Sequence, residues 1–207
     1  MENKIKIKVK KFAVKFPPIY RISHKIIKRL QGINPNQEGV AGKDLKFLLK
    51  NIGENKIVLE IGVLGGQTTR RLAKGNLVIS IDPFKGDIDT GTLCGEYPED
   101  VYKRFIKNTL GKDILLFPLT SEKAFIFWDK IIKRKILDVI FIDGLHTYEG
   151  VKIDFKWSKY LKKNGRVIFH DTHIKGVNKF IEENLLNNYQ YQYVGREGFT
   201  KAFKKKI

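Results

Sequence analysis

Short apolar runs alternate with longer amphipathic segments along most of this chain. The apolar runs predict five buried strands, at residues 56–61, 77–81, 114–117, 137–142 and 166–170. The amphipathic segments predict helices at about 42–51, 66–74, 98–109, 121–134, 147–163 and 176–187. Strands that alternate with helices of this length are typical of a parallel sheet covered by helices.

The C-terminal stretch YQYQYVGREGFTKAF predicts two further strands joined at Glu197-Gly198. Most doubly wound folds finish on a parallel strand, whereas a closing hairpin makes the last strand antiparallel to its neighbour. The pattern therefore predicts an α/β protein with a doubly wound sheet whose last strand is reversed.

Basic residues are concentrated at the two ends of the chain. Lys and Arg number 40 against 22 Asp and Glu, which gives a formal net charge of +18. Residues 1–30 hold ten Lys or Arg and one Glu, and we treat residues 1–40 as a basic N-terminal extension of a domain at 41–207. Basic ends can bind nucleic acid, an anionic membrane surface or an acidic glycan. A solvated lysine-rich surface is the favoured interpretation, because no nucleic-acid-binding module is visible.

Composition also bears on location and redox chemistry. No apolar run approaches the ~20 residues that a membrane-spanning helix needs, and the N-terminus lacks the apolar core of a secretory signal. We therefore expect a soluble protein in the cytoplasm. Cys94 is the single cysteine, so an intrachain disulfide and a cysteine-based zinc site are excluded, and we interpret it as an incidental thiol.

A glycine-rich turn follows the first predicted strand, in the run EIGVLGGQTTRRLA. Gly62, Gly65 and Gly66 would let the backbone approach a ligand at the start of the next helix. A dinucleotide-binding turn would need glycine where Glu60 stands, because a carboxylate there repels pyrophosphate. An acidic residue suits a cofactor with an ammonium group, such as S-adenosylmethionine. The alternative for the glycines is a plain structural turn.

Two polar positions after the next strands extend this interpretation. Asp82 follows the second strand, where a carboxylate can accept hydrogen bonds from the hydroxyls of a ribose. The alternative for Asp82 is a turn or helix-capping aspartate before Pro83. Ser121, after the third strand, is placed to meet an adenine ring, and helix capping by Ser121 is the alternative.

Three of the four histidines follow the last two predicted parallel strands. Asp143 and His146 come after the fourth strand, and His170, Asp171 and His173 come at or after the fifth. Because the reactive crevice of an open α/β sheet lies outside the carboxyl ends of its strands, this concentration favours a site.

The runs EIGVLGGQTT, SIDPF, FIDGLHTYEGVKIDF and NGRVIFHDT together resemble the class I S-adenosylmethionine-dependent methyltransferases. The similarity is greatest to the branch with macrolide-sugar O-methyltransferases and cephalosporin hydroxylase-like proteins. It covers roughly residues 40–203 and implies a Rossmann-like sheet of seven strands with the last one antiparallel and helices on both faces. The cofactor-binding residues that it implies are Glu60, Gly62, Gly65, Gly66, Thr68, Asp82, Ser121 and Asp143.

The resemblance also implies a divalent metal, Mg²⁺ or Mn²⁺, held by Asp143, His170 and Asp171. Related proteins commonly carry a carboxylate where His170 stands, and a nitrogen ligand would favour Mn²⁺ or Fe²⁺ beside Mg²⁺. The alternative is that Asp143 and Asp171 bind the ion while His170 faces the packing side. The catalytic residues that the resemblance implies are Asp143 and His146, with His146 as general base.

The predicted function is a metal-dependent O-methyltransferase that uses S-adenosylmethionine and acts on a hydroxyl of a sugar, glycan or other polyhydroxylated small molecule. A substrate-covering loop is predicted from Lys85 to Pro98. Tyr148 and Trp157 are predicted to pack in the core rather than to take part in chemistry. The alternatives are an RNA-binding protein or RNA methyltransferase, and less readily an NAD-dependent oxidoreductase. Self-association into a homo-oligomer is left open.

Overall fold

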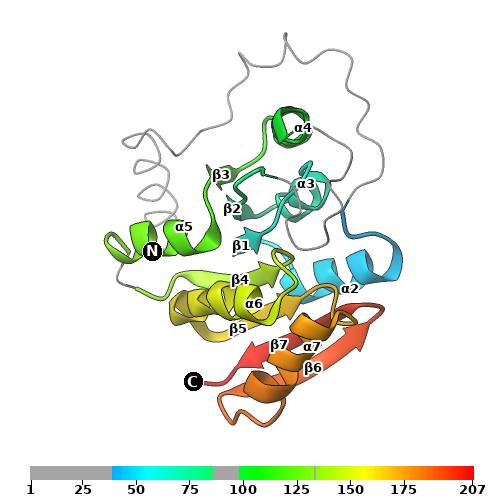
Figure 1. The fold of residues 1–207 in the computed structure, drawn as a ribbon, viewed down its shortest axis with the longest axis vertical. Helices are drawn as coiled ribbons and strands as arrows, with labels where there is room; N and C mark the ends of the chain where they lie inside the picture. Colours follow the sequence, from blue (N-terminus) through cyan, green and yellow to red (C-terminus); the bar gives the residue numbers. More distant parts are fainter. Residues whose placement is uncertain (1–38, 86–97, 133) are drawn as a thin grey trace.

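A seven-stranded sheet forms the centre of the computed structural model, which describes residues 39–85, 98–132 and 134–207 (Figure 1). The strand order is β3-β2-β1-β4-β5-β7-β6. The strands are β1 (Ile57–Ile61), β2 (Leu77–Ile81), β3 (Ile114–Phe117), β4 (Leu137–Ile142), β5 (Leu161–Phe169), β6 (Tyr191–Glu197) and β7 (Thr200–Lys205). Strand β7 is antiparallel to both β5 and β6, and the other pairs are parallel. The predicted fold class is confirmed, including the reversed last strand.

Helices cover both faces of the sheet. The helices are α2 (Gly42–Ile52), α3 (Gln67–Leu72), α4 (Pro98–Thr109), α5 (Ser121–Asp129), α6 (Tyr148–Phe155) and α7 (Lys175–Ile181). Buried side chains of α2, α3 and α4 share one hydrophobic cluster, and those of α5, α6 and α7 share the other. The chain therefore forms three layers, with the sheet in the middle.

Alternation along the strands explains the two clusters. Leu59 belongs to the layer of α5 and α6, whereas its neighbour Val58 belongs to the layer of α2 and α4. Successive side chains of a strand point to opposite faces, so a strand covered on both sides is apolar at nearly every position. Glu60 interrupts this apolar strand although it is completely buried.

The largest difference from the predicted elements lies between residues 147 and 170. Helix α6 ends at Phe155, a 3₁₀ turn covers Lys156–Tyr160, and β5 begins at Leu161 instead of residue 166. The predicted helix to residue 163 is therefore wrong. The 3₁₀ turn brings Trp157 and Tyr160 into the core, and Leu161 then pairs with Leu137 of β4. Packing of these large side chains overrides the helical pattern of the local sequence.

The ends of two other helices also differ from the prediction. Helix α5 ends at Asp129 instead of residue 134, and α7 passes into a π-helix over Glu182–Leu186. The remaining helix bounds agree with the predicted ranges to within two residues. Trp157 is buried, as predicted for a packing residue, and the Tyr148 ring packs against Phe180 at 5.7 Å.

Several predicted features fall outside the described residues. These are the basic extension up to residue 38, Cys94 and the interior of the Lys85–Pro98 loop. Val40, at the end of the predicted extension, is buried and donates its backbone N–H to Thr68 Oγ1 at 3.0 Å. In the part of the chain that the structure describes, no helix has the length and apolar character needed to cross a bilayer.

Candidate active site at the carboxyl ends of the strands

The ends of β1 and β4 meet at the centre of the sheet, where the strand order reverses. Beyond β1, Gly62 has a φ of 81°, and a β-carbon added there would lie 2.1 Å from the carbonyl oxygen of Asp143. Any side chain at this position would therefore collide with the backbone that follows β4. Ligands of open α/β sheets bind at this kind of switch point, so Gly62 marks the expected crevice.

Asp82 holds the glycine turn in place. Its Oδ2 accepts the N–H groups of Val63 (2.8 Å) and Leu64 (3.1 Å), and its Oδ1 accepts the N–H of Phe84 (2.7 Å). Burial raises the pKa of the Asp82 carboxyl, while these three backbone hydrogen bonds act to lower it. A carboxylate offers about four acceptor positions, so about one is left for a ligand. Asp82 thus has the turn role given as the alternative, and its contact with a ribose stays a prediction.

The remaining residues of the glycine turn face inward. Gly66 has a φ of 79°, and a β-carbon there would lie 2.9 Å from the Phe105 ring. The carbonyl of Gly65 accepts the side-chain amide of Asn108 at 2.7 Å, and Thr68 is buried with its hydroxyl bonded to Val40. These contacts pack the turn tightly against α4. Cofactor contacts of Gly65, Gly66 and Thr68 stay predictions.

Glu60 carries a buried carboxylate whose two oxygens have no hydrogen-bond partner among the described residues. Burial raises the pKa of this carboxyl well above its usual range, and the nearby carboxylates of Asp143 and Asp82 add to the rise. The nearby Thr69 hydroxyl acts to lower the pKa of Glu60, although it does not form a hydrogen bond with the carboxyl group. A buried carboxylate without a partner is costly, so its position beside the crevice fits a ligand that carries an ammonium group.

Ser121 does not cap helix α5. Thr120 is the capping residue and its hydroxyl accepts the N–H of Lys123, whereas Ser121 Oγ accepts the indole N–H of Trp157 at 3.1 Å. The capping alternative for Ser121 is therefore wrong. The contact of Ser121 with an adenine ring stays a prediction.

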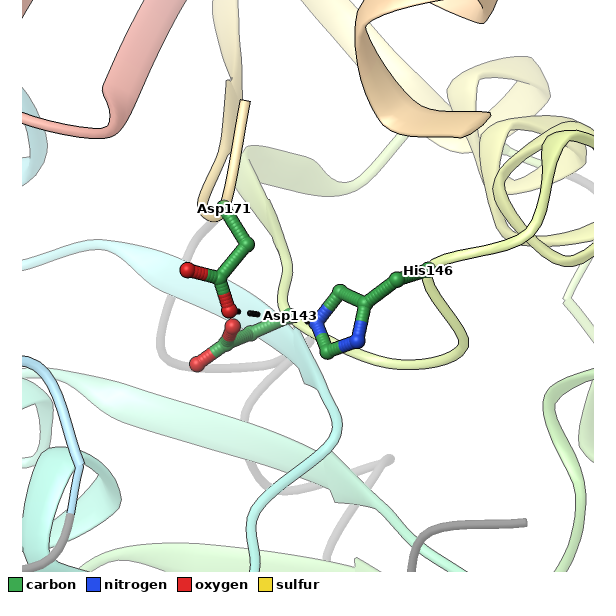
Figure 2. A group of neighbouring side chains, drawn as sticks. All are labelled: Asp143, His146 and Asp171. Carbon is green, nitrogen blue, oxygen red and sulfur yellow. Dashed lines mark ion pairs between the residues drawn. The ribbon is translucent and has the colours of Figure 1, made fainter. Parts of the chain in front are cut away.

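Asp143, His146, His170 and Asp171 converge beyond β4 and β5. His170 Nδ1 lies 3.0 Å from Asp143 Oδ1 and 3.4 Å from Asp171 Oδ2. On the other side of Asp171, His146 Nε2 lies 3.2 Å from the same Oδ2 atom. Figure 2 shows Asp143, His146 and Asp171 pointing toward one another from the two neighbouring strand ends. The structure thus brings together all four residues that were predicted for metal binding and catalysis.

An unusual backbone conformation lets two consecutive residues that follow β5, His170 and Asp171, face one site. Neighbouring residues of an extended strand point to opposite faces, but Asp171 has a φ of 50°, in the left-handed region. Leu64 (φ 42°) and Phe84 (φ 53°), which follow β1 and β2, share this conformation. Non-glycine residues adopt it at a cost and occur there preferentially at functional sites. All three lie beyond the same edge of the sheet.

The side chains of the cluster shift one another's pKa values. Burial alone would lower the pKa of His170, but the carboxylates of Asp143 and Asp171 raise it to about 10. Burial raises the pKa of Asp143 and His170 opposes the rise. Burial alone would raise the pKa of Asp171, but hydrogen bonds from His146 and His170 lower that pKa to well below its usual range. The cluster therefore holds closely paired opposite charges on side chains that are mostly buried.

The same cluster has donors suited to a divalent cation. Ligand atoms of Asp143, His146 and Asp171 all lie within 4.8 Å of one another. An octahedral ion bound at 2.0–2.1 Å places adjacent ligand atoms about 3 Å apart, which is close to the 3.0 and 3.4 Å spacings that His170 makes. The group that lies within 4.8 Å contains His146, whereas the prediction had His170 as the nitrogen ligand, so the structure adds His146 as a candidate ligand. The residues present therefore fit a metal ion.

Asp154 of α6 is a buried carboxylate that lies within the predicted helix 147–163. It is 4% exposed, and a β-carbon added at Gly144 would lie 2.9 Å from its Oδ2. Burial raises the pKa of Asp154 to about 7, while Ser121, hydrogen-bonded to it, and the charge of His146 act to lower it. One feature of the sequence indicates that Asp154 is buried. It lies three residues after the apolar Val151, which places both residues on one face of the helix. Asp154 thus lies directly behind the loop that carries Asp143 and His146.

The strand order, the glycine turn and the polar cluster define a class I methyltransferase fold of the type that uses S-adenosylmethionine. A family model described as a methyltransferase domain matches residues 59–172, which contain the turn and the whole cluster. The chain belongs to this methyltransferase family. The predicted resemblance to class I methyltransferases is thereby confirmed.

Solved structures of methyltransferases share the fold at low sequence identity. The O-methyltransferase NovP is 16% identical with a TM-score of 0.63, over 99% of this chain and 98% of that one. The calicheamicin methyltransferase CalS11 is 12% identical with a TM-score of 0.56, over 98% and 91% of the two chains. An O-methyltransferase from Bacillus cereus in complex with SAH is 16% identical with a TM-score of 0.54, over 99% and 100%.

One curated protein of similar sequence is much longer than this chain. The uncharacterized protein y4gI of Sinorhizobium fredii is 29% identical over 108 residues. These residues make up 50% of this chain and 11% of that protein, so the chain spans about a tenth of its length.

Proposed function

We propose that this protein is a metal-dependent O-methyltransferase that transfers the methyl group of S-adenosylmethionine to a hydroxyl of a sugar or another polyhydroxylated small molecule. The observation that carries the proposal is the convergence of Asp143, His146, His170 and Asp171 beside the Gly62 turn. Support for the acceptor class comes from CalS11, which is described as a TDP-rhamnose 3′-O-methyltransferase.

S-adenosylmethionine supplies a methyl group on a sulfonium, which an oxygen nucleophile attacks in line. Glu60, whose carboxylate has no hydrogen-bond partner in the described part of the chain, is proposed to bind the ammonium group of the cofactor, and the Gly62 turn lets the backbone approach the cofactor closely. The acceptor position of Asp82 that the turn leaves free suits one ribose hydroxyl. Gly65, Gly66 and Thr68 shape the same turn, and Ser121 lies beyond β3 on the predicted adenine side.

An alcohol is a weak nucleophile until its proton is removed. His146 is the proposed general base, because an imidazole with an ordinary pKa of ~6.5 can take a proton near neutrality. Asp171, 3.2 Å from His146 Nε2, orients the ring and favours the imidazolium that forms. A bound divalent cation would lower the pKa of the acceptor hydroxyl and orient it. Asp143 and Asp171 are the proposed oxygen ligands and His170 the proposed nitrogen ligand.

The assignment of the two histidines is tested by separating metal binding from turnover. Titration with Mn²⁺, followed by its EPR signal, should show binding to the wild type that is lost in His170→Ala and Asp143→Asn. His146→Ala should keep Mn²⁺ binding but lose about a hundredfold or more in turnover of labelled S-adenosylmethionine with a sugar-nucleotide acceptor. Glu183→Gln, a change of a carboxylate that is half exposed on its helix, serves as the matched control.

The opposite result has a clear meaning. If His146→Ala abolishes Mn²⁺ binding while His170→Ala retains it, the ligand set is Asp143, His146 and Asp171, and His146 is not the base. Turnover that persists unchanged in both Asp143→Asn and His146→Ala would remove the proposed site altogether.

The second candidate function is methylation of RNA, which the net charge of +18 favours. Polyanion binding by lysine-rich ends depends strongly on salt. An RNA arm in the same assay, run at low and high salt, distinguishes the candidates. Methyl transfer to RNA without transfer to sugar acceptors would replace the sugar proposal.

A further inference from the structure

The tip of the C-terminal hairpin is fixed beside the candidate active site by backbone contacts. The carbonyl of Phe199 accepts both the N–H and the hydroxyl of Thr172, each at 2.9 Å. The N–H of Phe199 donates to Asp44 Oδ1 of helix α2 at 2.8 Å. Thr172 directly follows Asp171, so the hairpin tip is hydrogen-bonded to the loop that carries the candidate ligand.

The Phe199 side chain is half exposed although its backbone is held on both sides. Its ring is 47% exposed and lies 4.1 Å from the His173 ring, centroid to centroid, at an interplanar angle of 40°. His173 is itself half exposed, and its Nδ1 lies 3.8 Å from Asp171 Oδ1. The His173 ring therefore lies between the candidate metal ligand Asp171 and the exposed Phe199 ring at the surface.

A second exposed apolar side chain stands on the other loop of the site. Leu145, next to His146, is 45% exposed. Single exposed apolar residues are common on protein surfaces and mean little by themselves. Here, however, Leu145 and His173 lie on the two loops that carry the polar cluster, and Phe199 contacts His173 from the hairpin tip. Apolar and aromatic walls around a few polar groups are typical of small-molecule sites.

We propose that Phe199 and His173 form an acceptor platform that binds the less polar face of a pyranose sugar ring. The C–H groups of such a face carry small positive charges and meet the negative face of an aromatic ring, while a hydroxyl at the edge of the sugar is directed toward Asp171, whose Oδ1 lies 3.8 Å from His173 Nδ1. The imidazole of His173 adds a hydrogen-bonding group at the border between the two. This inference rests on the proposed function and makes Phe199 a specificity-determining residue for the acceptor.

The geometry also makes the platform testable without damage to the fold. The hydrogen bonds of Phe199 are made by its backbone, and its described ring contact is His173, so removal of the ring should leave the hairpin in place. Tyr189 offers a matched control, because it is an aromatic residue 75% exposed that precedes β6, at the opposite end of the same hairpin.

The experiment uses the full chain loaded with S-adenosylhomocysteine and Mg²⁺. Saturation-transfer NMR is run with methyl α-L-rhamnopyranoside, methyl α-D-galactopyranoside and, as a flat aromatic comparison, catechol. Phe199→Ala should weaken binding of at least one pyranoside about tenfold, with the affinity for S-adenosylhomocysteine changed by less than about twofold. Phe199→Trp should restore pyranoside binding, and Tyr189→Ala should behave as the wild type.

Three outcomes would overturn the platform: no pyranoside binds the wild type, pyranoside binding is unchanged in Phe199→Ala, or only catechol binding depends on Phe199. Failure of the proposed function has a different signature, namely absence of methyl transfer to any hydroxyl acceptor by a wild type that binds S-adenosylhomocysteine normally. Sugar methylation that proceeds equally well in Phe199→Ala would refute the acceptor platform but not the proposed function.

Discussion

The buried carboxylate of Asp154 makes the stability of this protein depend on pH in a predictable way. Burial raises its pKa from the ordinary value of 3.8 to about 7, so the folded protein retains a proton that the unfolded chain has already lost. The resulting stabilisation is complete below the unfolded pKa and is lost as the pH rises through the folded pKa. Stability should therefore fall between about pH 4 and pH 7 and stay level above it.

The substitution Asp154→Asn removes the titration while keeping the size and polarity of the side chain. A shift of about three pKa units corresponds to roughly 4 kcal/mol, which is the upper bound for the gain of the variant over the wild type above pH 7. Below pH 4 the two proteins should be nearly equal in stability. At 2–4 °C per kcal/mol, the expected difference in Tm reaches roughly 10 °C at pH 8.

Thermal unfolding from pH 4 to pH 8, in the presence of a chelator, measures this difference directly. The other titrating groups are common to both proteins and largely cancel in the comparison. Glu149→Gln on the same helix is the control, since its side chain is 71% exposed and the change should leave the pH dependence as it is. A difference between Asp154→Asn and the wild type that is constant across this pH range would refute the reasoning.

Three further perturbations follow from the geometry. Gly62→Ala should lower the unfolding free energy by about 3 kcal/mol or more and weaken binding of S-adenosylhomocysteine in calorimetry, because its β-carbon would meet the carbonyl of Asp143 at 2.1 Å; near-normal stability would contradict this contact. Asp44→Ala should lower the unfolding free energy measured in urea by about 1–3 kcal/mol, since the N–H of Phe199 and the hydroxyl of Thr200 both donate to Asp44 Oδ1. An unchanged urea midpoint would mean that these hydrogen bonds do not hold the hairpin. Addition of Mn²⁺ to chelator-treated protein should raise Tm with increasing concentration, since binding adds about 2.7 kcal/mol to the unfolding free energy at a hundredfold excess over Kd; a concentration-independent Tm would exclude a specific metal site.

Much of the fold follows from local patterns in the sequence. Alternation of apolar runs and amphipathic segments is sufficient to predict the strands, because a strand covered by helices on both faces must be apolar at nearly every position. The hairpin around Gly198 is equally local, since a tight turn needs a residue that accepts a positive φ. The end of helix α6 was missed because the burial of Trp157 and Tyr160, which no local pattern expresses, determines where that helix stops.

The candidate site divides in the same way. That Asp143, His146, His170 and Asp171 come together could be predicted, because the carboxyl ends of adjacent parallel strands share one edge of the sheet. Which histidine faces which aspartate could not, because it depends on the left-handed backbone of Asp171 and on side-chain directions set by packing.

The sequence by itself determined the order of elements, the reversed last strand and the residue types available at the reactive edge, since these depend on periodicity and chain connectivity. Only the tertiary structure decided that Glu60 is buried with no hydrogen-bond partner within residues 39–85, 98–132 and 134–207, that Asp154 lies behind the loop of Asp143, and that Phe199 lies beside His173. Each of these three facts is a contact, or the lack of one, between residues of different structural elements. Distances of this kind arise when the layers pack together, and no local pattern of residues encodes them.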